Sequence, residues 1–349
     1  MRPTLPLVLA TLLAGCAQIG YYAHLATGQA SLLSRREPIE KIVADESRDA
    51  ELRRRLAFVL DARAFAIARL HLPDNASYTL YADLQRPYAV WNVIAAREFS
   101  LEPVESCFPI AGCVAYRGFY SEERARQWAA DLRAQGLDVD VSGTPAYSTL
   151  GWFDDPVLNT MMHWSDTILV NTVFHELAHQ QLYVKGDTTF NESFATFVGD
   201  EGLRQFLAAR GLADAQAAAD RTREEQFTRL VLAARERLAA LYAQPLKPEA
   251  MREAKRAAFE RLRSDYARLR DTAWGGDRRY EGWFSRELNN ATLAPFGLYD
   301  EFAPAFAALF ATSGGDWDAF YAASRKLGDE GPERRKQEMA RLRGQALPE

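Results

Sequence analysis

Several features that would place a chain in a specialised class are scarce in this sequence of 349 residues. Three cysteines are too few for a small fold held together by disulfide bonds. The 42 lysine and arginine residues face 47 acidic ones, and a net charge of −5 argues against a nucleic-acid partner, which would need a basic surface. No run of about 18 apolar residues occurs, so no segment is predicted to span a membrane.

What remains is the composition of an ordinary globular protein. Hydrophobic residues make up 48% of the chain and charged residues 26%, which is enough to build a sizeable core. At about 150 residues per domain, the length predicts one large domain or two closely packed ones. The sequence contains no internal repeat and no long low-complexity tract.

The first 15 residues have the pattern of a processing segment, with Arg2, an apolar stretch over 5–13 and small residues after it. The motif Leu13-Ala14-Gly15-Cys16 resembles the lipobox of bacterial lipoproteins, whose cysteine is acylated and becomes the first residue. This resemblance implies lipidation at Cys16. Because residue 17 is Ala rather than Asp, the resemblance favours attachment to the periplasmic face of the outer membrane over the alternative, attachment to the inner membrane. An ordinary secretory signal followed by a chance cysteine is the alternative.

Export would place Cys107 and Cys113 in an oxidising compartment, where disulfide bonds persist. Pro109 and Gly112 lie between them and can turn the chain back. We therefore predict a small disulfide loop, with two free buried thiols as the alternative.

Outside residues 151–212, hydrophobic periodicity and capping residues predict helices over 19–36, 49–70, 121–135, 213–242, 248–274, 301–311 and 317–327. Runs of β-branched and aromatic residues predict strands over 78–84, 89–95, 113–119, 137–141 and 146–150. This order predicts an α+β fold with a mixed α/β N-terminal part and a mainly helical C-terminal part. The two long helices should form an antiparallel hairpin, interpreted as a solvated arm.

The expected division of the chain is a signal peptide (1–15), an α+β part with a substrate-side strand (16–150), metal-binding helices (151–212), the helical hairpin (213–275), C-terminal helices (276–330) and a charged, frayed tail (331–349).

Residues 175–179 read His-Glu-Leu-Ala-His and match the pattern H-E-x-x-H. Four positions along a helix return a side chain to the same face, so His175 and His179 can present both imidazoles to one metal ion. Glu176 is the next residue along the helix, and its side chain is rotated away from the two imidazoles. It can therefore reach a water molecule beside the ion but is poorly placed to be a ligand. Ser165 is predicted to cap this helix, and Lys185-Gly186 to end it.

A third ligand is expected from the segment that follows. Asn191 is a suitable N-cap, so a second helix is predicted to begin at Glu192 and run back beside the first. The Glu192 carboxylate would then face the two imidazoles and complete a His₂Glu set with an open fourth position, as a hydrolytic zinc requires. Alternatively, Glu192 is an acidic residue that the helix macrodipole favours in a first turn.

His175–His179 followed by Asn191-Glu192-x-x-Ala195-Thr196 resembles the gluzincin metallopeptidases, including the zinc aminopeptidases. More widely, the chain resembles a family of bacterial lipoproteins described as predicted aminopeptidases. The wider resemblance covers most of residues 20–330 and is carried by segments 116–119, 146–153, 175–186, 288–291 and 320–321. It implies a zincin-like core, one Zn²⁺ held by His175, His179 and Glu192, and a peptide substrate.

The resemblance also implies roles for other residues. Glu176 would act as the general base. Thr196 could orient an imidazole, or simply pack within its helix. Gluzincins often take the donor to the developing oxyanion from a downstream Tyr or His, which points to Tyr299, with Tyr280 and His163 as competitors and a packing tyrosine as the alternative.

Zincin folds place the strand that lines the substrate just before the metal-binding helix, here at 146–150. Removal of N-terminal residues would need a carboxylate for the substrate ammonium, and Asp154, Asp155, Asp200 and Glu201 are available. Asp154 and Asp155 could instead belong to a turn before Pro156.

The function that the sequence favours is zinc-dependent hydrolysis of peptides, most simply removal of N-terminal residues in the periplasm. The alternatives are an endopeptidase that acts on envelope proteins and a non-catalytic envelope scaffold. A lipid anchor is expected, a nucleic-acid partner is not, and the sequence does not define the oligomeric state.

Overall fold

The computed structural model describes residues 5–108, 112–146, 153–212, 215–297 and 302–344, and it confirms an α+β fold in which helices predominate. The helices are α1 (Leu5–Ser34), α2 (Ile39–Ala44), α3 (Ala50–Leu70), α4 (Glu122–Ala134), α5 (Asp166–Gln181), α6 (Thr188–Ala209), α7 (Ala215–Tyr242), α8 (Pro248–Ala273), α9 (Glu281–Phe284), α10 (Asn290–Leu293), α11 (Ala303–Thr312), α12 (Trp317–Gly328) and α13 (Pro332–Arg343). The strands are β1 (Arg36–Pro38), β2 (Leu80–Ala82), β3 (Val90–Ala96), β4 (Ser106–Phe108), β5 (Gly112–Val114), β6 (Arg117–Phe119), β7 (Asp138–Thr144) and β8 (Val157–Leu158).

Capping residues set the starts of several helices where the sequence predicted them. The Asp49 carboxylate accepts a hydrogen bond from the Leu52 N–H at the start of α3, and the Ser121 hydroxyl accepts one from the Arg124 N–H at the start of α4. Gly136 follows α4 with φ of +80°, a conformation that favours glycine. The predicted strand over 113–119 is two short strands, β5 and β6, and the predicted strand over 146–150 lies mostly outside the described residues.

Two three-stranded sheets occupy the N-terminal part. In the first, the order is β1-β2-β8, with β2 antiparallel to β1 and parallel to β8. In the second, β3 lies between β6 and β7 and is antiparallel to both. Alternate residues of β3 face opposite sides. Trp91 and Val93 pack with α4, while Ile94 and Ala96 pack with Ala291 of α10.

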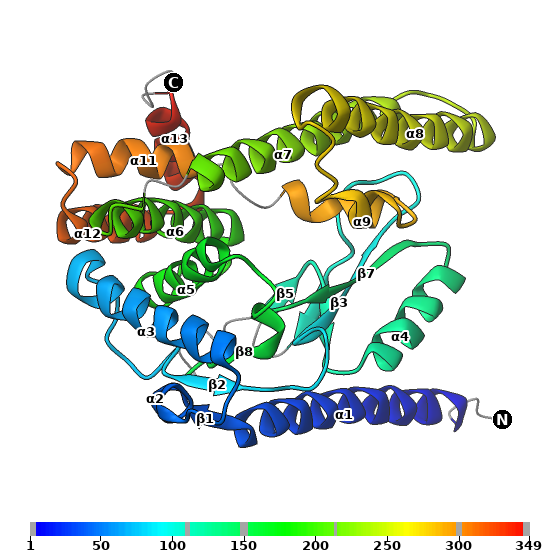
Figure 1. The fold of residues 1–349 in the computed structure, drawn as a ribbon. Helices are drawn as coiled ribbons and strands as arrows, with labels where there is room; N and C mark the ends of the chain where they lie inside the picture. The colour runs from blue at the N-terminus through cyan, green and yellow to red at the C-terminus, as the bar shows by residue number, and fades with distance from the viewer. Residues whose placement is uncertain (1–4, 109–111, 147–152, 213–214, 298–301, 345–349) are drawn as a thin grey trace.

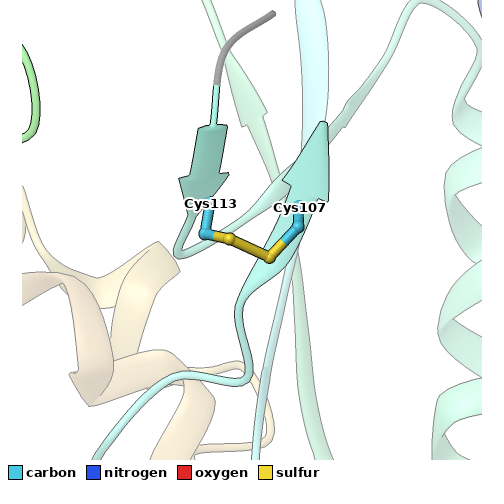
Figure 2. The surroundings of a disulfide bond; sticks show 2 residues. All are labelled: Cys107 and Cys113. Atoms are coloured by element: carbon cyan, nitrogen blue, oxygen red, sulfur yellow. A yellow bond between two sulfur atoms is a disulfide. The ribbon is translucent and has the colours of Figure 1, made fainter. Parts of the chain in front are cut away.

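The hairpin of β4 and β5 carries a disulfide bond between Cys107 and Cys113, which are paired across the two strands (Figure 2). The bond closes the short loop that the sequence predicted.

The largest hydrophobic core lies among α3, α5, α6, α11 and α12, which gather on one side of the molecule (Figure 1). Its largest fully buried side chains include Phe174 of α5, Phe194 and Phe206 of α6, and Phe320 of α12. Complete burial of a phenylalanine side chain contributes about 1.5–3 kcal/mol, so this aromatic cluster fixes the two central helices firmly.

The long helices α7 and α8 form a hairpin across the top of Figure 1 with a core of its own. Phe227 and Val231 of α7 pack against Leu262 and Tyr266 of α8 within this cluster. Leu101, from the loop after β3, belongs to the same cluster. The interpretation of the hairpin as a solvated arm is therefore wrong, because one face of it is packed against the sheet region.

Asn290 holds the hairpin, the β3 end and β7 together. Its side chain donates hydrogen bonds to the carbonyl oxygens of Arg97 and Glu98 and accepts one from the Tyr242 hydroxyl. Its backbone N–H donates to the Asp138 carboxylate. The segment 288–291, part of the family resemblance, thus has a structural role at this junction.

The C-terminal segment is not frayed over its described length. Helix α13 buries Met339 and Leu342 in the main core. Its Arg335 is almost fully buried and forms a 2.7 Å ion pair with Asp187. The prediction of a loose charged tail is wrong here because these three side chains give an otherwise charged helix a buried face.

Helix α1 includes residues 5–15 of the predicted signal segment, and Cys16 follows them in the same helix. No helix in the described ranges is long and apolar enough to cross a membrane.

Candidate functional site

Helix α5 carries the H-E-x-x-H residues. The Ser165 hydroxyl accepts a hydrogen bond from the Ile168 N–H and caps the helix as predicted. The helix ends at Gln181, four residues before the expected stop at Lys185-Gly186. His175 and His179 lie one turn apart near this end and project from the same face.

Helix α6 begins earlier than the sequence predicted. Its N-cap is Asp187, whose carboxylate accepts a hydrogen bond from the Phe190 N–H, so Asn191 lies inside the helix. The Asn191 amide instead bonds both backbone groups of Val184, the N–H at 2.7 Å and the carbonyl at 2.8 Å. Asn191 therefore fixes the α5–α6 connection, and Glu192 is not in the first turn, which removes the macrodipole interpretation of this residue.

Two glycines of α6 allow the two helices to approach closely behind the histidines. A Cβ atom on Gly199 would lie 3.2 Å from the Asn171 carbonyl oxygen and 3.4 Å from the Cβ of His175. A Cβ atom on Gly202 would lie 2.7 Å from Leu70 and 3.0 Å from Phe174. Larger residues would push α6 away from α5, so these glycines determine how near Glu192 comes to the imidazoles.

His175, His179 and Glu192 meet at one point between α5 and α6. The two Nε2 atoms are 3.1 Å apart, and Oε2 of Glu192 lies 3.4 Å from Nε2 of His175 and 3.6 Å from that of His179. Ligands about 2.05 Å from a tetrahedral zinc ion are about 3.3 Å from one another. The three separations fit that geometry, and two imidazoles with one carboxylate are a donor set suited to zinc.

The charges in this cluster are strongly coupled. Burial acts to raise the pKa of Glu192, but hydrogen bonds with the two histidines lower it to about 2. Burial acts to lower the pKa of His175, but its hydrogen bond to Glu192 and the nearby negative charge of Glu176 raise it overall. In the absence of a cation, these contacts thus favour an ionised Glu192 carboxylate that accepts hydrogen bonds from the imidazoles.

Glu176 adjoins this cluster from the next position of α5. Burial raises the pKa of its carboxyl group, while the two histidines act in the opposite direction. A carboxylate in such a dry position is a better proton acceptor near neutral pH than an exposed one.

Nδ1 of His179 is buried and lacks a hydrogen-bond partner within the described part of the chain. Metal-bound histidines usually donate this second N–H to an acceptor that fixes the ring. Thr196, the expected orienting residue, lies one turn after Glu192 on α6 and is half-buried.

The segment 75–78, for which the sequence predicted no role at the site, lies against α5. Asn75 donates a 2.6 Å hydrogen bond to the Gln180 side chain, which in turn contacts the Ser77 hydroxyl. Gln180 lies one turn after Glu176 and on the same face of the helix. The segment therefore brings Tyr78, the residue after Ser77, to the side of α5 that carries Glu176.

Tyr78 has φ of +62° and only 3% of its surface exposed. A bulky residue in this region of backbone conformation costs about 1–3 kcal/mol, so the surroundings must hold it there. The Tyr78 N–H donates to the Asp155 carbonyl at 2.7 Å, and the Asp155 N–H donates to the Ser77 hydroxyl at 3.3 Å. An isolated tyrosine among strand residues gives no sequence signal for such a position.

The structure places the candidate oxyanion donors in different surroundings. Tyr299 lies outside the described residues. Tyr280 stacks on Phe227 in the core of the helical hairpin, with ring centres 3.9 Å apart, and His163 is exposed. Two tyrosines nearer the cluster in the chain or by charge are both exposed, Tyr183 to 51% and Tyr116 to 43%. Burial and the negative charge of Glu192 raise the pKa of Tyr116, which places this residue at the rim of the site.

The four candidate ammonium-binding carboxylates differ in their exposure and in their partners. Asp154 is exposed, Asp200 accepts a hydrogen bond from the Asn171 amide, and Glu201 pairs with Arg204. Asp155 is 4% exposed, and its charge reaches Glu176, whose pKa it helps to raise.

A family model with the description "Putative aminopeptidase" matches residues 20–339, most of the chain. The matched region includes both helices of the histidine and glutamate cluster, the helical hairpin and all but the last turn of α13. No curated protein and no solved structure matches the chain.

Proposed function

The chain belongs to this aminopeptidase family, and on that premise we propose that it is a gluzincin-type zinc peptidase that removes N-terminal residues from peptides. His175, His179 and Glu192 would hold one zinc ion, and Glu176 would serve as the general base. The family membership supports peptide hydrolysis, and the chemistry of the cluster supports its dependence on a metal.

One observation carries the proposal. Three ligand atoms from two helices lie 3.1–3.6 Å apart, and a buried carboxyl group with a raised pKa stands beside them. A structural metal site needs its ligands but has no use for an adjacent general base. The combination therefore favours hydrolysis over a purely structural role.

A zinc ion bound to these residues would lower the pKa of a water molecule towards about 7 and polarise the scissile carbonyl. Glu176 would accept a proton from the attacking water as the new C–O bond forms. The same carboxyl group would then donate that proton to the leaving nitrogen as the C–N bond breaks. The raised pKa of Glu176 suits both halves of this transfer, because the group must gain and lose a proton near neutral pH.

An aminopeptidase must also recognise the charged N-terminus of its substrate. Asp155 is the carboxylate that we assign to this task, because it is buried and its negative charge helps to raise the pKa of Glu176. A low-exposure carboxylate attracts an ammonium group more strongly than a solvated one. An endopeptidase would not need this residue.

We further propose that the protein is a lipoprotein on the periplasmic face of the outer membrane. The lipobox-like sequence before Cys16 supports lipid attachment, and the Cys107–Cys113 disulfide suits an oxidising compartment.

The proposed activity can be tested with a library of peptides in free and N-acetylated forms. The zinc-loaded protein without its lipid would be incubated with both, and the products identified by mass spectrometry. Release of single residues from free N-termini alone is the expected result. Internal cleavage of both forms would instead identify an endopeptidase. Absence of cleavage in either form would favour a non-catalytic scaffold.

A further inference from the structure

The hydroxyl group of Tyr78 stands out among the polar groups near the site. Only 3% of this residue is exposed, and the side chain lies near enough to Glu176 for the charge of that carboxylate to raise its pKa.

The backbone around Tyr78 is arranged to keep this hydroxyl in place. The residue keeps a positive φ, held by its own N–H bond to Asp155 and by the contacts of Asn75 and Ser77 with Gln180 on α5. Strained conformations of this kind persist at functional sites, where they pre-organise a side chain.

The electrostatic surroundings of Tyr78 keep its proton on the oxygen. Burial, together with the negative charges of Glu176 and Asp155, raises the pKa of the hydroxyl well above its ordinary value. At neutral pH the group is therefore an O–H donor on the same side of α5 as Glu176.

We propose that Tyr78 donates a hydrogen bond to the carbonyl oxygen of the scissile peptide as that oxygen gains negative charge, an inference that rests on the proposed peptidase function. As water adds to the carbonyl carbon, the π electron pair moves to the oxygen and the Tyr78 O–H accommodates the charge without giving up its proton. The pair returns when the C–N bond breaks. A donor fixed in a dry site acts at no cost of reorganisation during the reaction.

This assignment departs from what the gluzincin resemblance implies. There the donor comes from a segment downstream of the metal-binding helices, whereas Tyr78 precedes them and is placed by the β1-β2-β8 sheet region. Tyr116 is the competing hydroxyl at the site rim, but 43% of that residue is exposed, against 3% of Tyr78, so its side chain is less firmly placed.

The test is Tyr78→Phe, which removes the hydroxyl and keeps the ring. Tyr81→Phe is the matched control, because Tyr81 is also buried and lies in the adjacent strand β2. We expect kcat to fall 10²–10³-fold in Tyr78→Phe, with KM within about threefold of wild type. Zinc content and Tm should match those of the wild type. Tyr81→Phe should retain wild-type kcat.

A second readout separates a catalytic role from a structural one. The affinity for a phosphinic peptide, which imitates the tetrahedral state, should fall by about the same factor as kcat/KM, while the affinity for a substrate-like product peptide stays unchanged. Calorimetry measures both without turnover, so this comparison applies even to a wild-type protein that cleaves none of the peptides tried.

Unchanged kcat and unchanged phosphinic-peptide affinity in Tyr78→Phe would overturn the inference, as would loss of zinc or a large fall in Tm. Loss of activity in Tyr116→Phe but not in Tyr78→Phe would assign the donor to Tyr116 instead. A failure of the proposed function looks different: the wild type would neither cleave peptides nor bind the phosphinic peptide.

Discussion

Nε2 of His175 and Nε2 of His179 face each other at 3.1 Å, and both lie within 3.6 Å of a single oxygen of Glu192. Two imidazole nitrogens at this distance repel each other if both carry a lone pair, so the arrangement needs a proton or a cation between them. The close packing of α5 on α6 maintains it.

Metal binding should depend on all three ligands and on little else. We expect one zinc ion per chain in the wild type and at least 100-fold weaker binding in His179→Ala, because the remaining two ligands cannot close the site. His163→Ala is the control, since His163 is exposed and outside the cluster. Zinc competition with a chromophoric chelator measures both. Equal affinities in the two variants would contradict the assignment.

Gly199→Ala should disturb the site without touching a ligand. The added Cβ would meet the Asn171 carbonyl oxygen at 3.2 Å and would have to displace α6. We expect a loss of about 1–3 kcal/mol in stability, together with weaker zinc binding. Gly282→Ala, where a Cβ meets nothing within 4 Å, should do neither. Thermal unfolding and zinc titration of both variants decide the matter, and normal zinc affinity in Gly199→Ala would show that helix spacing is unimportant.

Asp187 should be important for stability because it caps α6 and pairs with the buried Arg335 of α13. Asp187→Ala removes both interactions and should cost about 3 kcal/mol or more. Asp187→Asn keeps a capping side chain and should be less destabilising by about 1 kcal/mol. Urea unfolding of the pair measures the difference, and identical losses would mean that the cap contributes nothing.

The metal-free protein should lose stability in acid through Glu192. Its pKa is about 2 when folded, against an ordinary value of 4.5, so its stabilising effect is present above pH 4.5 and is lost as pH falls towards 2. The contribution is on the order of 3–4 kcal/mol at most, because one pKa unit corresponds to about 1.4 kcal/mol. In the presence of a chelator, the stability difference between wild type and Glu192→Gln should therefore shrink as pH is lowered from 6 to 2. A constant difference over that range would show that Glu192 is not held by the histidines.

The sequence predicted most of the helices because caps such as Asp49 and Ser121 and a clear hydrophobic periodicity act locally. It misplaced the start of α6 because Asn191, a good N-cap, is recruited instead by the backbone of Val184. It missed the packing of α13, where three buried side chains decide the outcome in a charged segment.

At the candidate site, too, the features that depend on local sequence were predicted and those that depend on tertiary contacts were not. A helical repeat of four residues was enough to bring His175 and His179 together, and the spacing to Glu192 suggested its place. The sequence offered no sign of Tyr78 and marked Asp155 only as one of four carboxylates, because the placement of both depends on a backbone hydrogen bond between segments far apart in the chain.

The most direct test of the account is peptide hydrolysis by wild type and Glu176→Gln, with zinc content measured on the same samples. We expect hydrolysis by the zinc-loaded wild type, none after chelation, and recovery when zinc is returned. Glu176→Gln should bind one zinc ion with wild-type affinity and lose at least 10²-fold in kcat, since it cannot accept the proton of the attacking water. Wild-type turnover by Glu176→Gln would contradict the mechanism.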